Sequence, residues 1–292
     1  MSVALDSGCM ECHLRRNLET ARGLGTEEQA TAFAKALMKL YLSAPEGAST
    51  PWLAPHTAEL FRKMYGLDAD RFRAEKEASN RFVLSRLDQI RRRAQAAPDP
   101  VYAGLQFAIL GNYLDFSALQ GQVDFGKLDE MLDSALEMEL DENAYRAFRR
   151  DLETGKRLLY LTDNAGEIGF DRVLAEEIQK AYPHLAITFC VRGDVIVNDA
   201  TREDARAVGL PFPVIDNGNR VGGTDLNQLS EDARQALEDA DVVLAKGMGN
   251  AETMLGCGYN VYYAFLIKCP RFIQRFEKPM LTPMFLRETG RA

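Results

Sequence analysis

A strand-turn-helix pattern at residues 157–171, RLLYLTDNAGEIGFD, constrains the fold more than any other stretch of the sequence. It begins with a run of apolar residues that predicts a fully buried strand, and this run ends at Asp163 and Asn164. Two small residues then lead into Glu167 and an apolar repeat at helical spacing. In α/β proteins, cations and anions bind where such a strand ends and the next helix begins. The pattern therefore predicts an α/β protein with a binding site at this strand end.

The remaining sequence divides into a helical part and a part in which strands and helices alternate. From Thr26 to about Arg149 the apolar spacing is helical, and Thr26–Gln29 has the pattern of a capping box. The predicted later strands are 157–161, 186–191, 212–215, 241–245 and 262–267, and the predicted helices are 167–181, 201–208, 230–239 and 251–258. This alternation predicts a parallel sheet with helices on its faces. We therefore predict a helical N-terminal domain at 1–152 and an α/β domain at 153–292.

Composition and charge exclude several classes of protein. The 292 residues are 46% hydrophobic and 27% charged, as is usual for a globular protein. The formal net charge is −8, which argues against nucleic acid as a partner and requires any phosphate site to be built locally. The opening residues, MSVALDSGC, do not resemble a secretory signal, and no apolar run is long enough to cross a bilayer. We therefore expect a cytoplasmic protein without a membrane partner.

The chain contains five cysteines, and Cys9 and Cys12 form an isolated Cys-x-x-Cys pair. In a reducing compartment these residues are expected to be thiols rather than a disulfide framework. A zinc site would need a second pair of ligands, and the other cysteines and histidines are scattered along the sequence. We expect a structural or incidental role for the pair, with redox or metal chemistry as the alternatives.

The predicted helix at 101–119 is apolar on several faces but carries Asn112 and Asp115 on one face. Burial of a carboxylate without a partner is unfavourable. The sequence leaves two interpretations open. Either the C-terminal end of this helix reaches solvent, or both residues line a polar cleft.

Polar residues follow three of the predicted strands. They are Asp163-Asn164, then Asn198-Asp199 within RGDVIVNDAT, and finally the segment KGMGN at 246–250. Each has a simpler structural explanation, because Asn164 and Asp199 could be helix N-caps and the glycines could form turns. However, the carboxyl ends of parallel strands meet at one edge of a sheet, so we expect the three groups to lie together.

The residue types in these groups suit one another chemically. Asp163, Asn164 and Asp199 offer hard oxygen ligands with no histidine or cysteine nearby in sequence, which favours Mg²⁺ or Mn²⁺ over zinc. Lys246, the following glycine amides and a helix N-terminus would supply positive charge for a phosphate. A metal on one side and an ammonium on the other form a clamp for a phosphoryl group.

Other catalytic signatures are missing from the sequence. KGMGN lacks the Lys-Ser or Lys-Thr ending of a Walker A loop, no Gly-x-Gly-x-x-Gly follows the first strand, and there is no Gly-x-Ser-x-Gly elbow. The three histidines are not in a triad-like context. Phosphatases with an aspartyl nucleophile have a second aspartate two positions on, where this chain has Ala165.

The motifs DNAGEIGFD, RGDVIVNDAT, AKGMGN and GNYLDF together resemble the damage-control phosphatases, formerly domain of unknown function 89. The resemblance covers nearly the whole chain, and the N-terminal Cys-x-x-Cys is similar to the prokaryotic-type branch. It implies a Rossmann-like α/β domain with a divalent cation held by Asp163, Asn164 and Asp199. The substrate contacts that it implies are Glu167, Asn112, Asp115, Lys246, Gly247, Met248, Gly249, Asn250 and Lys268.

The sequence departs from the family pattern at several positions. It has Gly193-Asp194-Val195 where a Gly-Gly-Pro type of turn is commoner, and Ala251 where an aromatic residue is usual. Lys268 also lacks the Arg-Thr seen in other branches. These departures bear on substrate identity more than on the metal site.

Our principal hypothesis is a metal-dependent phosphatase for small phosphorylated metabolites such as sugar phosphates. Asp163 and Lys246 are its expected catalytic residues, Mn²⁺ or Mg²⁺ its expected cation with Co²⁺ or Ni²⁺ as alternatives, and a small phosphate ester its partner. Lys246 and Lys268 would neutralise charge in the transition state, whether water or Asp163 attacks the phosphorus. The alternatives are a non-catalytic binder of a phosphometabolite or carboxylate and, with less support, a methyltransferase. The sequence does not predict an oligomeric state.

Overall fold

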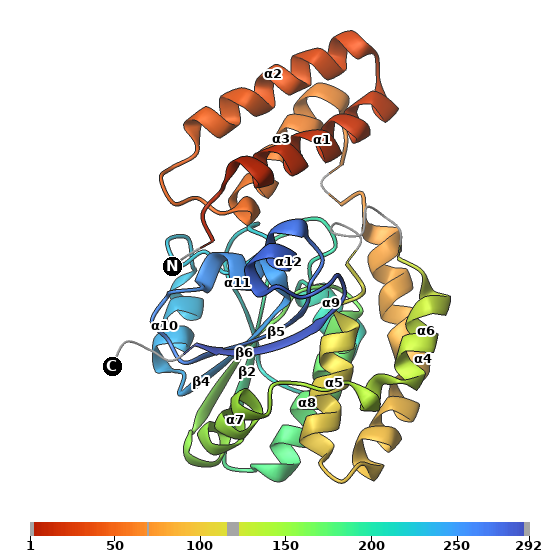
Figure 1. Ribbon diagram of the computed structural model, residues 1–292, viewed down its shortest axis with the longest axis vertical. Coiled ribbons are helices and arrows are strands. Elements are labelled where there is room, and N and C mark those ends of the chain that lie inside the picture. Colours follow the sequence, from red (N-terminus) through yellow and green to blue (C-terminus); the bar gives the residue numbers. More distant parts are fainter. Residues whose placement is uncertain (1–2, 69, 116–122, 289–292) are drawn as a thin grey trace.

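The computed structural model describes residues 3–68, 70–115 and 123–288 (Figure 1). Its described part contains a six-stranded sheet in the order β3-β2-β1-β4-β5-β6. The strands are β1 (Arg157–Leu161), β2 (Ala186–Val191), β3 (Val214–Asp216), β4 (Val242–Lys246), β5 (Val261–Leu266) and β6 (Pro283–Glu288). The first five are parallel, and β6 runs antiparallel to β5 at the edge. The predicted α/β fold class is therefore confirmed.

Helices lie on both faces of this sheet and in a separate layer beyond it (Figure 1). The helices before the sheet are α1 (Ser7–Leu24), α2 (Glu27–Ser43), α3 (Thr50–Tyr65), α4 (Arg73–Ala96), α5 (Pro100–Gly111), α6 (Phe125–Asp133), the short 3-10 helix η1 (Ala135–Glu137) and α7 (Glu142–Thr154). Those within the α/β part are α8 (Glu167–Ala181), α9 (Arg202–Ala207), α10 (Glu231–Asp239), α11 (Gly247–Met254) and α12 (Pro270–Phe276). Among the described helices, none combines the length and hydropathy needed to cross a bilayer.

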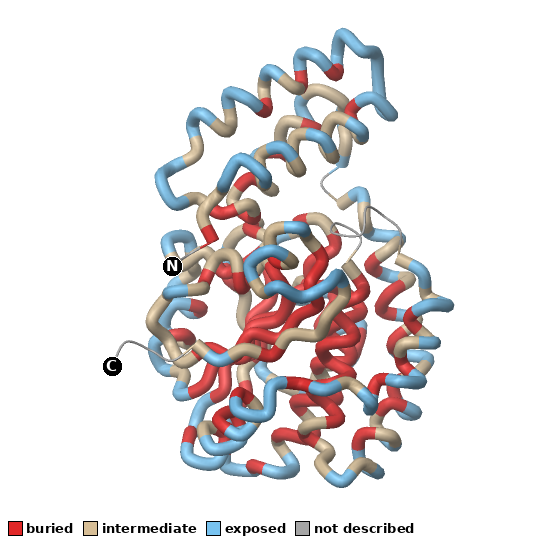
Figure 2. The backbone as a smooth tube through the Cα atoms, viewed as in Figure 1, coloured by how far each residue is buried: buried red, intermediate tan, exposed pale blue. Residues whose placement is uncertain are grey.

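The strands bury both of their faces, because successive side chains point to opposite sides of a sheet. Leu158 and Tyr160 pack into the core beneath α4, α5, α7 and α8. Leu159 and Leu161, the alternating residues of the same strand, pack into the core beneath α10, α11 and α12. This two-sided burial explains why the strand sequence is a continuous apolar run rather than an alternating one (Figure 2).

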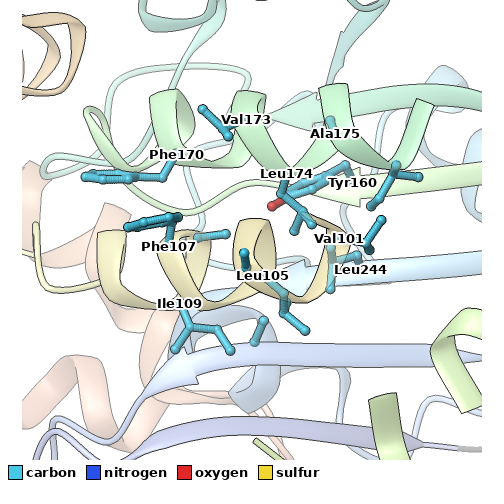
Figure 3. Close-up of a cluster of buried hydrophobic side chains, with 14 of the residues drawn as sticks. Val101, Leu105, Phe107, Ile109, Tyr160, Phe170, Val173, Leu174, Ala175 and Leu244 are labelled. Atoms are coloured by element: carbon cyan, nitrogen blue, oxygen red, sulfur yellow. The ribbon is translucent and has the colours of Figure 1, made fainter. Parts of the chain in front are cut away.

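The buried helix α5 packs closely against α8, and small residues allow this approach. A Cβ atom added at Gly104 would lie 3.0 Å from Leu174 Cα, and one added at Gly111 would lie 2.6 Å from the Phe170 ring. Figure 3 shows side chains of α5, α8 and the sheet filling one continuous core. The position of α5 matters for function, because its last turn reaches the carboxyl edge of the sheet.

The helices before the sheet fall into two packing groups, and the predicted domains at 1–152 and 153–292 stay a prediction. Helices α1, α2 and α3 have a small core of their own around Phe33 and Phe61, and they form a separate layer (Figure 1). Helices α4 to α7 instead share one hydrophobic core with the sheet. Helical periodicity is the same in both sets, so the sequence pattern alone did not separate them.

Most predicted elements of the α/β part match the structure closely. The bounds of β1, β2 and α8 are as predicted, and the capping box at Thr26–Gln29 is present. Helix α11 begins at Gly247, four residues before the predicted start, and β6 was not predicted. Helix α5 ends at Gly111, with Asn112 as its C-cap, whereas the prediction continued the helix to 119. Residues 116–119 of that prediction lie outside the described residues.

Candidate metal and phosphate site

The candidate site lies at the carboxyl edge of the sheet, where strand order reverses. Strand β1 pairs with β2 on one side and with β4 on the other, so the chain leaves the sheet in opposite directions from this point. Leu161 at the end of β1 is paired with Ala245 of β4, directly before Lys246. Open α/β sheets bind ligands at such a switch point, outside the strand ends.

The loops that follow β1 and β2 are joined by backbone hydrogen bonds. Asn164 and Asp199 form an isolated antiparallel bridge. Ala200 N donates to Asp163 O at 2.7 Å, and Ala165 N donates to Asn198 O at 2.9 Å. The structure thus brings the predicted cation ligands Asp163, Asn164 and Asp199 together. It does not use them as helix caps, since α8 is capped by Gly166 and α9 by Thr201.

The Asp163 carboxylate is almost fully buried among polar groups. Its Oδ2 accepts hydrogen bonds from Asn164 Nδ2 at 2.7 Å and from Asn112 Nδ2 at 3.0 Å. Burial raises the pKa of Asp163 well above its ordinary value, and the nearby charges of Glu167 and Asp199 raise it further. A carboxylate crowded in this way is stabilised by any cation that comes between it and its neighbours.

Glu167 is fully buried in the first turn of α8 and contacts three other predicted site residues. Asn112 Nδ2 lies 2.9 Å from Glu167 Oε2 and 3.1 Å from Oε1, and Asn164 Nδ2 donates to Oε2 at 2.8 Å. Asn112 also accepts a hydrogen bond through Oδ1 from Leu266 N at 3.1 Å. Asn112 therefore faces the interior of the site and ties α5 to the end of β5.

The sequence predicts that Lys246 contacts a phosphate, but its ammonium lies in the protein interior. Its ammonium is fully buried and donates hydrogen bonds of 2.8 Å to Ala108 O, Glu167 Oε1 and Asp171 Oδ1. Burial opposes the charged form, but the carboxylates of Asp171 and Glu167 outweigh it and raise the pKa of Lys246 to about 12. An ammonium has three N–H donors, so these acceptors leave none for a phosphate. In this arrangement Lys246 holds Glu167 in place.

Behind Lys246 the polar network ends at a tyrosine. Tyr160 OH donates to Asp171 Oδ1 at 2.7 Å, and both side chains are buried. Burial raises the pKa of Asp171, the charge of Lys246 opposes that rise, and Glu167 adds to it. The hydrogen-bonded series Tyr160, Asp171, Lys246 and Glu167 thus links the site to β1 and β4, the two central strands of the sheet.

Lys268, two residues after the end of β5, is the second lysine of the site. Its Nζ donates to Asn112 O at 2.7 Å and to Asp115 Oδ2 at 2.6 Å. The side chain of Lys268 is buried, while that of Asp115 is partly exposed. Among the described residues, these two acceptors engage two of the three N–H donors of Lys268. Lys268 is therefore better placed than Lys246 to donate to a phosphoryl oxygen.

The segment from 246 to 250 fits closely against Asp163. Gly247 has a φ of +79°, and a Cβ atom added there would lie only 2.0 Å from Asp163 Oδ2. A Cβ atom at Gly249 would lie 2.0 Å from Gly222 O. Helix α11 begins at Gly247, so its first backbone N–H groups start beside Asp163. Glycine is required at both positions, because the Asp163 carboxylate occupies the space of a side chain at Gly247 and the Gly222 backbone occupies it at Gly249.

Met248 and Asn250, also predicted as substrate contacts, have their side chains in the protein interior. Asn250 Nδ2 donates to Lys246 O at 2.7 Å and to Thr162 O at 3.1 Å, and Thr224 Oγ1 donates to Asn250 Oδ1 at 2.8 Å. Met248 Sδ accepts from Lys268 N at 3.3 Å. These contacts indicate that both side chains hold the strand ends together.

Arg192 is a site residue that the sequence prediction missed. Its buried guanidinium donates through Nε to Asp199 Oδ2 at 2.7 Å, and its Nη2 lies 3.7 Å from Asp163 Oδ1. Among the described residues Nη2 has no hydrogen-bond partner. Burial raises the pKa of Asp199, and Arg192 partly offsets this rise. A signal was present in the sequence, because Arg192 opens the RGDVIVNDAT motif directly after a buried strand.

The donor set fits a hard divalent cation. Two carboxylates and an amide supply the oxygens, which suits Mg²⁺ or Mn²⁺. In the arrangement described, Asn164 Oδ1 accepts from Asn198 Nδ2 at 3.0 Å, so the amide must rotate before its oxygen faces Asp163.

Within the described ranges, no group of three or more His, Cys, Asp and Glu side chains is arranged to hold a metal ion. That finding includes Cys9 and Cys12, which lie on α1 as free thiols.

A protein-family model described as the damage-control phosphatase ARMT1-like domain matches residues 5–280. The chain belongs to this family. The resemblance seen in the sequence motifs is thus confirmed for nearly the whole chain. The assignment to a branch from Cys9 and Cys12 stays a prediction.

Two relatives and one solved structure are similar to this family member over most of its length. Protein MJ0202 of Methanocaldococcus jannaschii is 30% identical over 280 residues, covering 92% of this chain and 90% of that protein. The damage-control phosphatase of Archaeoglobus fulgidus is 30% identical over 252 residues, covering 84% of this chain and 85% of the relative. The crystal structure of the DUF89 family protein PH1575 of Pyrococcus horikoshii is similar with a TM-score of 0.82 at 25% identity, covering 98% of this chain and 99% of that one.

Proposed function

We propose that this protein is a phosphatase that hydrolyses small phosphorylated metabolites, with a divalent cation held by Asp163, Asn164 and Asp199. Family membership and the relatives named damage-control phosphatases support the hydrolase class. Metal dependence is proposed from the oxygen ligands of the site, and sugar phosphates or related esters are the substrates that we propose to test.

The observation that carries this proposal is the convergence of oxygen ligands with the Lys268 ammonium and the Arg192 guanidinium at one strand edge. Asp163 lies within hydrogen-bond distance of Asn112, whose backbone oxygen accepts from Lys268. The same edge carries Asp199, paired with Arg192. Anionic and cationic groups therefore alternate over a few ångströms in a buried setting, where electrostatic interactions are stronger than in water.

We assign a separate task to each group. Asp163, Asn164 and Asp199 would hold the cation, which when bound supplies Lewis-acid polarisation of a phosphoryl oxygen and activation of water. Lys268 would donate to the phosphoryl group and balance the charge that develops there. The backbone N–H groups at the start of α11, beside Asp163, would supply further donors to the same anion. Asn112 orients Asp163, Glu167 positions Asn112 and Asn164, and Lys246 fixes Glu167.

The experiment is a phosphate-release assay on chelator-treated protein supplied with Mn²⁺, Mg²⁺, Co²⁺ or Ni²⁺ and a panel of sugar phosphates. We expect turnover with at least one cation and its loss in Asp163→Ala. Asp194→Ala is the matched control, because Asp194 is an exposed carboxylate on the loop that also carries Asp199. Saturable, metal-dependent binding without product would instead assign the protein to the non-catalytic binders. Equal turnover by Asp163→Ala would overturn the proposed site.

A further inference from the structure

A second buried polar cluster lies behind the two loops that carry the proposed cation ligands. It consists of Lys76 and Asn80 on α4, together with Thr201 and Asp204 at the start of α9. We call these four residues the latch. Lys76, Asn80 and Asp204 are buried and Thr201 is half-buried, and the proposed function assigns them no role.

Asn80 connects the latch to the loop after β1. Its Oδ1 accepts a hydrogen bond from Gly166 N at 2.7 Å, and its Nδ2 donates to Asp204 Oδ1 at 3.0 Å. Gly166 has a φ of +76°, and a Cβ atom there would lie 2.6 Å from Ser79 Cβ. Asn80 therefore holds the turn between Asn164 and Glu167 at a point where the chain has little freedom to move.

Asp204 connects the same latch to the loop after β2. Its Oδ2 accepts from Thr201 N at 2.8 Å and from Thr201 Oγ1 at 2.9 Å, and it pairs with Lys76 Nζ at 2.8 Å. Thr201 lies two residues after Asp199 and forms a backbone bridge with Arg192. One carboxylate is therefore bonded to the Asp199 loop through one oxygen and, through Asn80, to the Asn164 turn through the other.

We propose that Asp204 is a positioning residue that sets the distance between the Asn164 turn and the Asp199 loop. This inference rests on the proposed function, because it concerns the two loops that supply the cation ligands. The capping box of α9 needs only Thr201 and Asp204. The additional bonds of Asp204 to Lys76 and Asn80 reach more than a hundred residues along the chain, and they exceed what a helix cap requires.

Polar groups behind metal ligands hold the ligands in a geometry that the metal can use. Loss of such a group typically lowers metal affinity about 10- to 100-fold. The Asn80→Leu variant tests this, because leucine has a similar volume but neither accepts from Gly166 N nor donates to Asp204. Mn²⁺ binding to the metal-free protein, followed by electron paramagnetic resonance, should weaken about tenfold or more.

The control is Leu87→Ala, which shortens a core side chain on the same helix without touching the latch. It should lower the unfolding temperature at least as much as Asn80→Leu and leave the Mn²⁺ affinity within about twofold, because the sites are independent. An equal loss of Mn²⁺ affinity in both variants would show that the latch affects the metal site only through the overall stability of the protein. Unchanged Mn²⁺ affinity in Asn80→Leu would overturn the inference while leaving the proposed function intact.

A second measurement needs no metal and separates the two proposals. In Asp204→Ala, backbone hydrogen exchange should accelerate both in 163–168 and in 199–204, because both loops lose one common anchor. In Asn80→Leu it should accelerate mainly in 163–168. Acceleration confined to 199–204 in Asp204→Ala would show that Asp204 caps α9 and nothing more. If Asp204→Ala fails to fold, Asn80→Leu and its Mn²⁺ affinity still decide the question.

Discussion

Lys246 Nζ and Glu167 Oε1 are 2.8 Å apart, and neither side chain has any exposed surface. Asp171 Oδ1 lies at the same distance from the ammonium, so one buried cation is shared by two buried carboxylates. Buried charges persist only when they are paired and hydrogen-bonded. The charge of Lys246 therefore stabilises the two buried carboxylates and is not available at the surface of the site.

Replacement of Lys246 by methionine should therefore lower the free energy of unfolding of the protein. Glu167 and Asp171 would lose their common partner, and removal of one member of a buried ion pair typically costs about 3–5 kcal/mol. Urea unfolding followed by circular dichroism measures the change. Asp171→Asn in the same chain should restore part of the stability. A stable Lys246→Met protein with only a raised KM would return Lys246 to the phosphate-contacting role expected from the sequence.

Replacement of Lys268, unlike that of Lys246, should mainly lower the catalytic rate. Lys268→Met should lower kcat about 10²- to 10³-fold, the usual loss when one donor to a developing anion is removed. Lys268→Arg should keep part of the activity because it keeps a positive donor. Lys278→Met, which changes an exposed lysine of the next loop, is the control and should be neutral. Full activity in Lys268→Met would remove Lys268 from the site.

Gly247→Ala should abolish most activity through a steric conflict with Asp163. The added Cβ atom would lie 2.0 Å from the carboxylate, and a displacement of about 1 Å at a catalytic group can reduce the rate about 100-fold. Gly47→Ala is the matched control, because Gly47 has the same φ of +79° but no atom within 4 Å of an added Cβ. Steady-state kinetics of both variants separate the conflict with Asp163 from backbone strain. Equal losses would attribute the effect to strain alone.

His13 should make the layer of α1, α2 and α3 sensitive to acid. Its Nδ1 lies 2.8 Å from Tyr41 OH and its Nε2 lies 3.2 Å from Thr57 Oγ1, so the ring joins all three helices. Burial, with a smaller contribution from Arg16, lowers the pKa of His13 to about 4. The unfolded chain therefore binds a proton from about pH 6.5 downward, whereas the folded chain resists it until about pH 4.

The stabilisation from neutral His13 is thus complete above pH 6.5 and is lost as the pH falls toward 4. Between pH 7.5 and pH 5 the loss should be roughly 2 kcal/mol, seen as a lower unfolding temperature. His13→Gln should flatten this pH dependence. His184→Gln, at an exposed histidine, should leave it unchanged. The same pH dependence in His13→Gln and in the wild type would contradict the assignment.

Local pattern was sufficient for the central strand-turn-helix unit. The bounds of β1 and α8 agree with those predicted, because the apolar run and the helical repeat depend on neighbouring residues. The predicted parallel strands also placed Asp163 and Asp199 at the same, carboxyl edge of the sheet. Strand β6 was missed since it is an antiparallel edge strand whose pairing with β5 is not encoded by strand-helix alternation.

The sequence by itself determined an α/β fold, the strand that ends at Asp163 and the family to which the chain belongs. Only the tertiary structure decided which polar groups face one another: that Lys246 is enclosed by Glu167 and Asp171, that Arg192 pairs with Asp199, and that helices α4 to α7 belong to the core of the sheet. The physical reason is distance along the chain. Periodicity is set by residues within a turn or a strand, whereas the partner of a buried charge is selected by packing between segments that are far apart in sequence.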